Sequence, residues 1–425
     1  MAKTNKHLNT LQTMIISGVW SDATYEDIAQ QSRWSEAHVK SVGAQLWEVL
    51  SDILLEPVNK KNVRAIFERH YRDLLPTETS LALADDFPLT LEFPDGPVNL
   101  SSPLYCVRPP VETQCYDMIT QPGALIRIRA PRHMGKTSLL NRIVKQAKDL
   151  DYNTVALSLQ IVDSDILQDL DRFLQWFCGR VTQKLNLPLQ IADYWDDIFG
   201  SKTSCKDYFE NYLLPTCQKP LVLALDEVDT LFKYPATADG FFALLRAWYE
   251  DAKNDTLWQV LRLILVHSTD AYIPLNINQS PFNVGIPIEL PEFNAQQVAH
   301  LVESHGLQWT TEQTQSLMDL LGGHPYLIRL ALYHIVQTPM SLESLLATAL
   351  DTRGPFFPHL QHLTHLMEQH PDWITFLRQM IADQASGSLN PMDLFQLTRL
   401  GLVEMRDGQV QIRCELYRQW LRNCF

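Results

Sequence analysis

The feature of this chain that most constrains its fold is the stretch at residues 124–140 (ALIRIRAPRHMGKTSLL). A β-like run enters a tight turn, and Gly-Lys-Thr then opens an amphipathic helix, which is the context of a Walker A phosphate loop. Ala130 stands where that pattern has its first glycine, and alanine costs little there if the backbone φ is negative. The stretch therefore predicts a phosphate-binding loop between a strand and a helix.

The residue types of this loop suit phosphate chemistry. Backbone N–H groups of the loop and of the helix N-terminus are expected to face the β-phosphate. Lys136 would place its charge between the β- and γ-phosphates, and Thr137 would offer a hydroxyl to Mg²⁺. The other residues expected to bind the nucleotide here are Ala130, Pro131, Arg132, His133, Met134, Gly135 and Ser138. The expected cofactors are ATP or ADP with Mg²⁺.

A second motif tests this interpretation. Residues 220–229 (PLVLALDEVD) read as a buried strand that ends in acids, which is the Walker B pattern. Asp226 is expected to hold Mg²⁺ through water, and Glu227 to orient the attacking water as a base. Asp229 is either a further acid of the site or the N-cap of the next helix, and the cap is favoured. Two motifs in this order predict an ATPase, and no N-K-x-D motif follows the loop to support guanine specificity.

Two further positions are candidates for sensing or completing the reaction. Residues 261–270 (LRLILVHSTD) form an apolar strand with a polar end. Ser268 or Thr269 is the candidate γ-phosphate sensor at that end, with an ordinary turn as the alternative. Arg246 lies in a helical pattern and is a candidate catalytic arginine finger across a subunit interface, with a surface charge as the alternative.

Composition excludes several classes of protein. The 425 residues carry a net charge of −14, and 46% of them are apolar, which is ordinary for a globular protein. No apolar run approaches the length of a membrane span, and the N-terminal stretch has no signal-peptide pattern. The seven cysteines contain no C-x-x-C pair, so a cytoplasmic location is expected. The acidic balance disfavours a protein that coats nucleic acid.

Two stretches resemble the AAA-like ATPase domain that is widespread in cyanobacterial signalling proteins. They are residues 108–115 (RPPVETQC) and residues 122–141 (PGALIRIRAPRHMGKTSLLN). The resemblance covers about residues 85–425, and the group is similar to the STAND and replication-initiator branches of P-loop ATPases. It implies that Arg108 and Glu112 line the adenine and ribose of the nucleotide.

The same resemblance extends to Gly323-His324-Pro325, which is similar to the GxP motif of STAND ATPases. It implies that Pro325 lies against the adenine from a helical lid. It also implies that Arg329, one turn further on, is a second sensor arginine near the γ-phosphate. Taken alone, the glycines of this stretch predict only a turn between two helices.

The C-terminal residues 397–425 read as helix, hairpin, helix, with Asp407-Gly408 as the hairpin turn. This order is typical of a winged helix. In STAND relatives such a domain folds back on the nucleotide site and holds the ADP-bound state shut. A free DNA-binding winged helix is the alternative.

Residues 24–47 read as a helix-turn-helix in which Ser35 caps the second helix. The module resembles the N-terminal helix-turn-helix of vWA-MoxR-associated proteins, which belongs to bacterial signalling or conflict systems. Residues 1–71 hold equal numbers of basic and acidic side chains, which favours protein docking over DNA contact. DNA contact stays open. The side chains expected to form the inner face are Ile28, Ala29, Val39, Val42 and Leu46, and those that could face a DNA groove are His38, Lys40, Ser41 and Gln45.

The expected fold class is multidomain α/β: a P-loop NTPase parallel sheet with a helical lid and a winged helix, preceded by an all-α helix-turn-helix domain. Short apolar strands that alternate with long helical stretches support the parallel sheet. The expected boundaries are a helix-turn-helix at 1–75, an extended linker or hairpin at 76–103, the ATPase core at 104–290, the lid at 291–355 and the winged helix at 356–425.

Together these features predict an ATP-binding, slowly hydrolysing switch in bacterial signalling or defence. The winged helix would report the nucleotide state, and the N-terminal module would recruit a protein partner. One alternative is a DNA-binding ATPase, similar to initiators or transposition regulators, that oligomerises on duplex DNA. Another is a nucleotide-bound scaffold that does not hydrolyse ATP. A nucleotide-dependent homo-oligomer is possible, and no membrane partner is expected.

Overall fold

The computed structural model divides the chain into two compact units, Met1–Pro88 and Leu89–Phe425, and each is described here by itself. The structure describes residues 11–12, 15, 24–30, 34–54, 58–60, 63, 91–196, 198–268, 280–338, 340–382, 389–406 and 408–425. Within these residues no helix combines the length and apolar character needed to cross a membrane.

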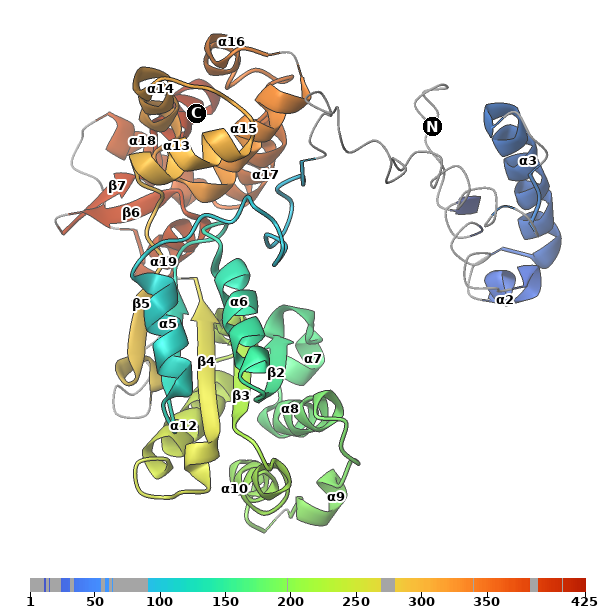
Figure 1. The fold of residues 1–425 in the computed structure, drawn as a ribbon, viewed down its shortest axis with the longest axis vertical. Coiled ribbons are helices and arrows are strands. Elements are labelled where there is room, and N and C mark those ends of the chain that lie inside the picture. The colour runs from blue at the N-terminus through green and yellow to red at the C-terminus, as the bar shows by residue number, and fades with distance from the viewer. Residues whose placement is uncertain are drawn as a thin grey trace, which may run out of the picture. The chain divides into compact units, whose positions relative to one another are not determined.

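The N-terminal unit contains the expected helix-turn-helix, formed by α2 (Tyr25–Gln30) and α3 (Glu36–Leu54) (Figure 1). The Ser35 hydroxyl accepts the backbone N–H of His38 at 3.3 Å, so the predicted cap of α3 is present. Of the predicted inner face, Ile28, Val39 and Leu46 are buried, while Ala29 and Val42 are half-buried against them. The apolar periodicity of this segment therefore marked its core correctly.

The larger unit is built on a parallel sheet of five strands in the order β2-β3-β4-β1-β5 (Figure 1). The strands are β1 (Leu125–Arg129), β2 (Asn153–Ser158), β3 (Leu221–Asp226), β4 (Leu261–His267) and β5 (Ile286–Glu289). The central position of β1 and β4 brings their carboxyl ends beside that of β3. The predicted phosphate loop and Walker B acids therefore lie together at the carboxyl ends of the strands of one sheet.

Alternating apolar side chains of the strands supply two separate cores, one on each face of the sheet. In β3, Leu223 and Leu225 face one core, whereas Val222 and Ala224 face the other. Helices α5 (Val111–Thr120) and α6 (Lys136–Asp149) cover the second face, and α8 (Leu170–Lys184), α10 (Ser201–Tyr208) and α12 (Pro235–Asp251) cover the first. Shorter helices complete the core: η2 (Leu159–Ile161), α7 (Ser164–Leu167), α9 (Ile191–Tyr194), η3 (Phe209–Leu213), α11 (Leu214–Thr216), η4 (Val228–Lys233), η5 (Trp258–Val260) and η6 (Pro281–Asn283).

Residues 291–425, called the C-terminal body below, contain both the predicted lid and the predicted winged helix. The lid helices are α13 (Ala295–Ser304), α14 (Thr311–Leu321), α15 (Pro325–Gln337) and α16 (Leu342–Ala347). The rest comprises α17 (Phe357–Glu368), α18 (Pro371–Ile381), α19 (Pro391–Leu400), the antiparallel hairpin β6 (Val403–Arg406) and β7 (Gln409–Ile412), and α20 (Glu415–Cys424). The expected helix, hairpin, helix order is therefore present. One hydrophobic core joins side chains from both segments, so the lid and winged helix pack as one body.

The segment before the sheet packs on the phosphate-loop helix. Residues 76–90 of the predicted linker lie outside the described residues, and residues 91–103 contain bends and turns but no strand. The backbone N–H of Val98 donates to the Ser138 hydroxyl at 2.9 Å. The described part of this segment is therefore a linker packed on α6, and it does not form a hairpin.

Candidate nucleotide site

The loop between β1 and α6 has the backbone shape of a phosphate-binding loop. Gly135, the N-cap of α6, has a φ of 90°, a left-handed conformation in which a side chain is strained. A Cβ atom there would also lie 3.1 Å from Nη2 of Arg108. His133 has a φ of 63° in the same loop. Both the conformation and the close approach explain why the motif requires glycine at 135.

Lys136 is buried inside this loop. Its ammonium donates to the carbonyl oxygens of Ala130 and Pro131, both at 2.8 Å. Burial lowers the pKa of Lys136 to about 8, although the nearby carboxylates of Asp229 and Asp226 act in the opposite direction. The group therefore remains mostly protonated at pH 7, and its positive charge is held at the loop by neutral carbonyl groups.

The two Walker motifs meet at a hydrogen bond. The hydroxyl of Thr137, in the first turn of α6, donates to Oδ2 of Asp226 at 2.8 Å. The other oxygen of Asp226 accepts the backbone N–H of Glu227 at 2.9 Å. Burial raises the pKa of the Asp226 carboxyl. A hydroxyl and a carboxylate in contact offer the hard oxygen ligands that Mg²⁺ takes alongside phosphates and water, so these residues fit an ATP–Mg²⁺ complex.

Glu227 has an unusual backbone conformation at the end of β3. Its φ of 54° is left-handed, which is uncommon for a residue with a side chain and tends to occur at functional sites. Its carboxylate is half-buried, and its pKa is raised by burial first and then by the neighbouring charges of Asp226 and Asp229. The turn that follows β3 therefore gathers three acids beside the phosphate loop.

Asp229 does not cap a helix, and the prediction that favoured a cap was wrong. The position before η4 (Val228–Lys233) is occupied by Glu227, so Asp229 lies inside that helix. Its buried carboxylate instead pairs with Nε of Arg399 in α19 at 2.7 Å. Arg399 could not be predicted as this partner, because no local sequence pattern links an arginine in the C-terminal body to the end of β3.

Arg132 and His133 connect the loop to the C-terminal body. The backbone N–H of Arg132 donates to the carbonyl of Arg399 at 3.0 Å. The His133 ring lies 4.7 Å from that of Tyr326 and 5.8 Å from that of His359, measured between centroids. Desolvation lowers the pKa of His133 to about 4, although the residue as a whole is exposed. The neutral imidazole therefore packs against aromatic rings of the C-terminal body.

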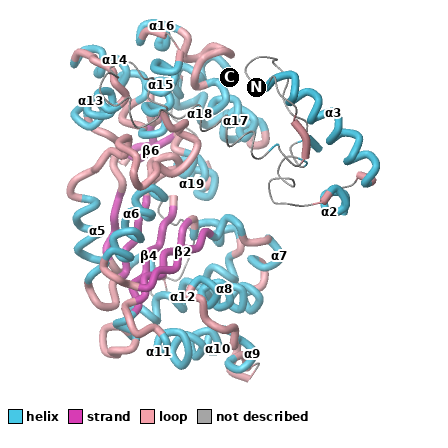
Figure 2. Tube along the Cα trace, turned by 45° about the vertical axis from the view of Figure 1, so that its right-hand side comes forward, coloured by secondary structure: helices cyan, strands magenta, loops and turns pink. Residues whose placement is uncertain are grey.

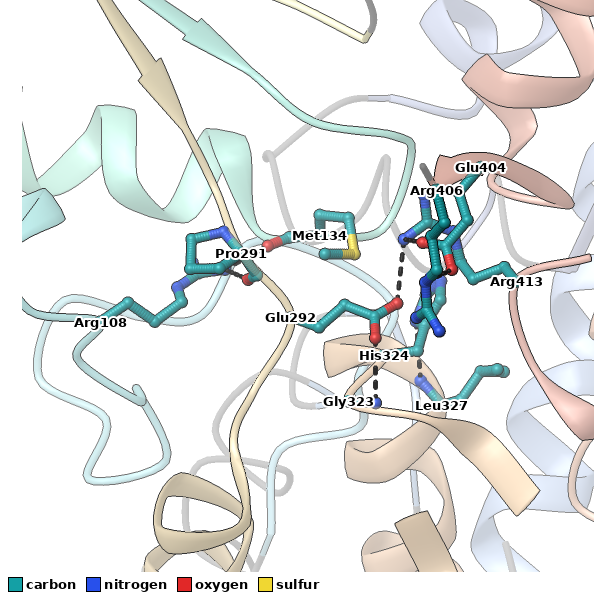
Figure 3. Close-up of polar contacts among 10 residues, drawn as sticks. All are labelled: Arg108, Met134, Pro291, Glu292, Gly323, His324, Leu327, Glu404, Arg406 and Arg413. Atoms are coloured by element: carbon teal, nitrogen blue, oxygen red, sulfur yellow. Dashed lines mark hydrogen bonds and ion pairs between the residues drawn. The ribbon is translucent and has the colours of Figure 1, made fainter. Parts of the chain in front are cut away.

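Arg108 braces the phosphate loop from the side of α5. Its guanidinium donates to the carbonyls of Met134 at 2.8 Å and of Pro291 at 3.4 Å (Figure 3). Glu112 accepts the backbone N–H of Arg108 at 2.9 Å. Both side chains are buried. Arg108 thus contacts the phosphate loop, and the expectation that Arg108 and Glu112 line the adenine and ribose stays a prediction.

The lid turn at Gly323 is fixed from two sides by Glu292. One carboxylate oxygen accepts the backbone N–H of Gly323 at 3.2 Å, and the other pairs with Arg413 of the winged helix at 2.9 Å (Figure 3). His324 caps α15 through its Nδ1, and Pro325 follows in the first turn, buried. A Cβ atom placed on Gly401 would lie 3.5 Å from Cβ of Pro131 and 4.0 Å from Nε2 of His324. The turn and the phosphate loop are therefore close.

Three predicted residues have their contacts elsewhere. Arg329 is buried and donates to the carbonyl of Glu92 at 3.4 Å. Arg246 pairs with Glu250 one turn along α12 at 2.6 Å. Ser268 is buried directly after β4, and Thr269 lies outside the described residues. No contact of Arg329 or Arg246 in the described part of the chain reaches the phosphate loop, and the functional roles of all three stay predictions.

Comparison with known families agrees with this geometry. Residues 93–423 match the model of the AAA-like domain. The chain belongs to the AAA-like domain family. Residues 1–70 match the N-terminal helix-turn-helix of vWA-MoxR associated proteins. Both resemblances noted in the sequence are thus confirmed.

Solved structures resemble the AAA-like unit in fold. A Walker-type ATPase of Pyrococcus abyssi aligns with a TM-score of 0.51 at 12% identity, over 75% of this chain and 96% of that one. The ORC2 protein of Aeropyrum pernix, solved in ADPNP–ADP complexes, aligns with a TM-score of 0.46 at 16% identity, over 76% of this chain and 94% of that one. The first likeness supports the P-loop ATPase fold.

A curated relative covers part of the chain. An uncharacterized WD repeat-containing protein of Synechocystis is 27% identical over 209 residues, which cover 46% of this chain. The chain spans only 17% of that relative's length. The family match and the contact between the two Walker motifs agree with a P-loop ATPase domain in residues 93–423.

Proposed function

We propose that this protein is a STAND-like molecular switch that binds ATP, hydrolyses it slowly and signals its nucleotide state through the C-terminal body. The observation that carries the proposal is a pair of contacts at the phosphate loop. Thr137 and Asp226 connect the two Walker motifs, and Arg132 connects the same loop to the C-terminal body. A switch needs two such features, a nucleotide site and a domain that touches it. We further propose that the setting is bacterial signalling or defence, as the N-terminal family match suggests.

The residues around the phosphate loop have distinct roles in this proposal. Lys136 leaves the loop carbonyls to neutralise the β- and γ-phosphates, and Thr137 and Asp226 hold Mg²⁺. Bound ATP supplies the γ-phosphoryl group that water attacks. The raised pKa of Glu227 makes its carboxylate a stronger base, which suits a residue that orients this water. Supporting roles stay as predicted for Arg108, Glu112, the loop residues 130–135, Ser138, Ser268, Pro325, Arg329 and Arg246.

Two experiments test the nucleotide part of the proposal. Binding of a fluorescent ADP analogue should be lost in Lys136→Ala, and binding that survives this change would contradict the proposal. Phosphate release at saturating ATP should fall in Glu227→Gln by about 100-fold, because the water then lacks its base. A wild-type protein that binds ATP without any release of phosphate would instead be the scaffold that does not hydrolyse.

The partner is proposed to be another protein, bound by the helix-turn-helix. Within residues 1–71 the charges balance, which suits a docking module better than a phosphate-coating one. A nucleotide-dependent homo-oligomer is part of the same proposal. The particle mass with ADP, and with an ATP analogue that resists hydrolysis, tests for this oligomer.

A DNA-binding ATPase is the second candidate function. The observation in its favour is that α3 leaves His38, Lys40, Ser41 and Gln45 exposed on one helix. Lys40 pairs with Glu36 at 2.7 Å, which reduces its free positive charge. ATP-stimulated binding to duplex DNA that weakens steeply with salt would favour this function over the switch.

A further inference from the structure

Helix α19 belongs to the C-terminal body but reaches into the core of the ATPase sheet. Phe395 is only 7% exposed and packs in the ATPase core, with its ring 5.9 Å from that of Phe232. Leu397 of the same helix, and Leu402 just after its end, pack in the core of the C-terminal body. Figure 2 shows α19 between the sheet and the other helices of that body. The helix therefore joins two cores that are otherwise separate.

Arg399 follows Phe395 by one helical turn, so both side chains lie on the same face of α19. Its guanidinium pairs with Asp229, whose side chain is 1% exposed, while that of Arg399 is 10% exposed. An ion pair this deeply buried is strongly disturbed when one partner is removed, because the other charge is left without compensation. The charge of Asp229 therefore depends on a residue of the C-terminal body.

The backbone of Arg399 makes a second contact, with the other Walker motif. The last carbonyls of a helix have no partner inside the helix. The carbonyl of Arg399 instead accepts the backbone N–H of Arg132, in the phosphate loop, at 3.0 Å. One residue thus holds the phosphate loop through its main chain and the Walker B turn through its side chain.

These contacts also bear on Glu227. The turn from Asp226 to Asp229 is anchored at its start by the hydroxyl of Thr137 and at its end by Arg399. Glu227 lies between the two anchors in a left-handed conformation, which is held only where the surroundings enforce it. The backbone of Glu227 is therefore held between an anchor on each side.

We propose that Arg399 is a positioning residue through which the C-terminal body controls how tightly the ATPase site retains its nucleotide. With the Asp229 pair formed, both Walker segments are held in place and bound ADP leaves slowly. Loss of the pair releases the Walker B turn while the main-chain contact to the phosphate loop remains, and ADP then leaves faster. This inference rests on the proposed nucleotide switch and assigns its regulation to one side chain.

The test uses the full chain and measures dissociation of a fluorescent ADP analogue after dilution into unlabelled ADP. Arg399→Met removes the charge and keeps most of the side-chain volume, and it should speed dissociation about tenfold, a typical coupling between two parts of a protein. Arg399→Lys keeps the charge and should stay within about twofold of wild type. Arg406→Ala is the matched control, because it removes an exposed arginine of β6 whose ion pair, among the described residues, is with Glu404 of the same strand.

A double-mutant cycle separates the pair from general destabilisation. Asp229→Asn should speed dissociation as Arg399→Met does, and the double variant should dissociate no faster than either single variant. Rates that multiply in the double variant would overturn the proposal, because the residues would then act independently. A wild-type dissociation rate in Arg399→Met would overturn it as well, and if that variant does not fold, the same outcome in Asp229→Asn decides.

Failure of this inference is distinguishable from failure of the proposed function. If wild type does not bind the ADP analogue, or if Lys136→Ala binds it equally well, the nucleotide switch itself is wrong. If wild type binds and Lys136→Ala does not, only the dissociation rates of the Arg399 and Asp229 variants bear on the positioning role. Arg399→Met should leave the association rate unchanged, whereas a partly unfolded protein would show fewer binding sites.

Discussion

The phosphate end and the lid end of the nucleotide site are held by different kinds of contact. At the phosphate end, side chains from two sequence motifs contact each other, as in the hydrogen bond of 2.8 Å from Thr137 to Asp226. At the lid end, the predicted residues bond to the protein's own main chain or support it. Arg329 donates to the carbonyl of Glu92, and Gly323 donates its N–H to Glu292.

This difference separates residues that act on a ligand from residues that shape the site. The side-chain oxygens at the phosphate end suit a metal ion. At the lid end, Glu292 accepts the N–H of Gly323 and pairs with Arg413, and these two contacts fix the turn. Substitutions should therefore impair chemistry at the phosphate end and folding at the lid end.

The largest effect is expected at the lid end, from Gly323→Ala. A Cβ atom on Gly323 would lie 2.1 Å from the carbonyl oxygen of Phe293 and 2.8 Å from its nitrogen, and neither backbone atom can move aside cheaply. We expect the free energy of unfolding to fall by about 4 kcal/mol, measured by urea denaturation. Gly96→Ala is the control, because a Cβ atom there has nothing within 4 Å. Equal stability of the two variants would contradict the claim that substitutions at the lid end impair folding.

The next effect is expected at the phosphate end, from Thr137→Val. Valine has the same shape but removes the hydroxyl that donates to Asp226. We expect steady-state phosphate release to fall about 100-fold, because a preorganised oxygen ligand of the site is lost. The free energy of unfolding should fall by about 1 kcal/mol, because the buried Asp226 carboxylate loses one hydrogen-bond donor. Thr137→Ser keeps the hydroxyl and should retain most of the activity, and a Thr137→Val protein as active as Thr137→Ser would refute this role.

Two buried arginines, Arg108 at the phosphate loop and Arg329 at the lid, test whether the two ends differ in their effect on nucleotide binding. Arg108 donates to the carbonyl of Met134 in the phosphate loop, whereas Arg329 donates to the carbonyl of Glu92 outside it. Arg108→Ala should weaken binding of the ADP analogue about tenfold, because the loop loses a hydrogen bond worth about 1 kcal/mol or slightly more. Arg329→Ala should leave the affinity within about twofold of wild type. A larger loss of affinity in Arg329→Ala would contradict this contrast between the two arginines.

Sequence patterns predicted the parts of the molecule whose contacts are local. The Walker motifs specify their own loop and strand end, and the cap at Ser35 and the inner face of α3 follow from spacing within a few residues. Contacts between distant segments could not be predicted. Asp229 was assigned to a cap because its partner, Arg399, lies in another part of the chain and no periodicity connects them.

The same limit applies to residues whose role was carried over from a family resemblance. The resemblance at Arg108 implies that this residue lines the adenine and ribose, and that role stays a prediction. Its guanidinium donates to the carbonyls of Met134 and Pro291, which tertiary packing alone places there. These hydrogen-bond partners therefore could not be predicted from the sequence.

The smallest expected effect concerns pH at the lid end. His324 is buried, and its pKa is lowered well below 6.5 by desolvation, with His359, Arg413 and His133 adding in the same direction. The unfolded chain therefore takes up a proton first as the pH falls below about 6.5, and the contribution of His324 to stability, fully present above that pH, is progressively lost. Between pH 7.5 and 5.5 this loss should be about 1 kcal/mol.

His324→Asn isolates the titration from the capping role. Asparagine is a preferred N-cap that can accept the N–H of Leu327, as His324 does at 3.5 Å, but it does not titrate. Urea denaturation at both pH values should show a smaller loss of stability for the variant than for wild type, by about 1 kcal/mol. The remaining loss in the variant belongs to other groups, among them His359, whose pKa desolvation lowers to about 3. An unchanged pH dependence in His324→Asn would mean that His324 already titrates normally in the folded protein, so that its burial beside the phosphate loop is not permanent.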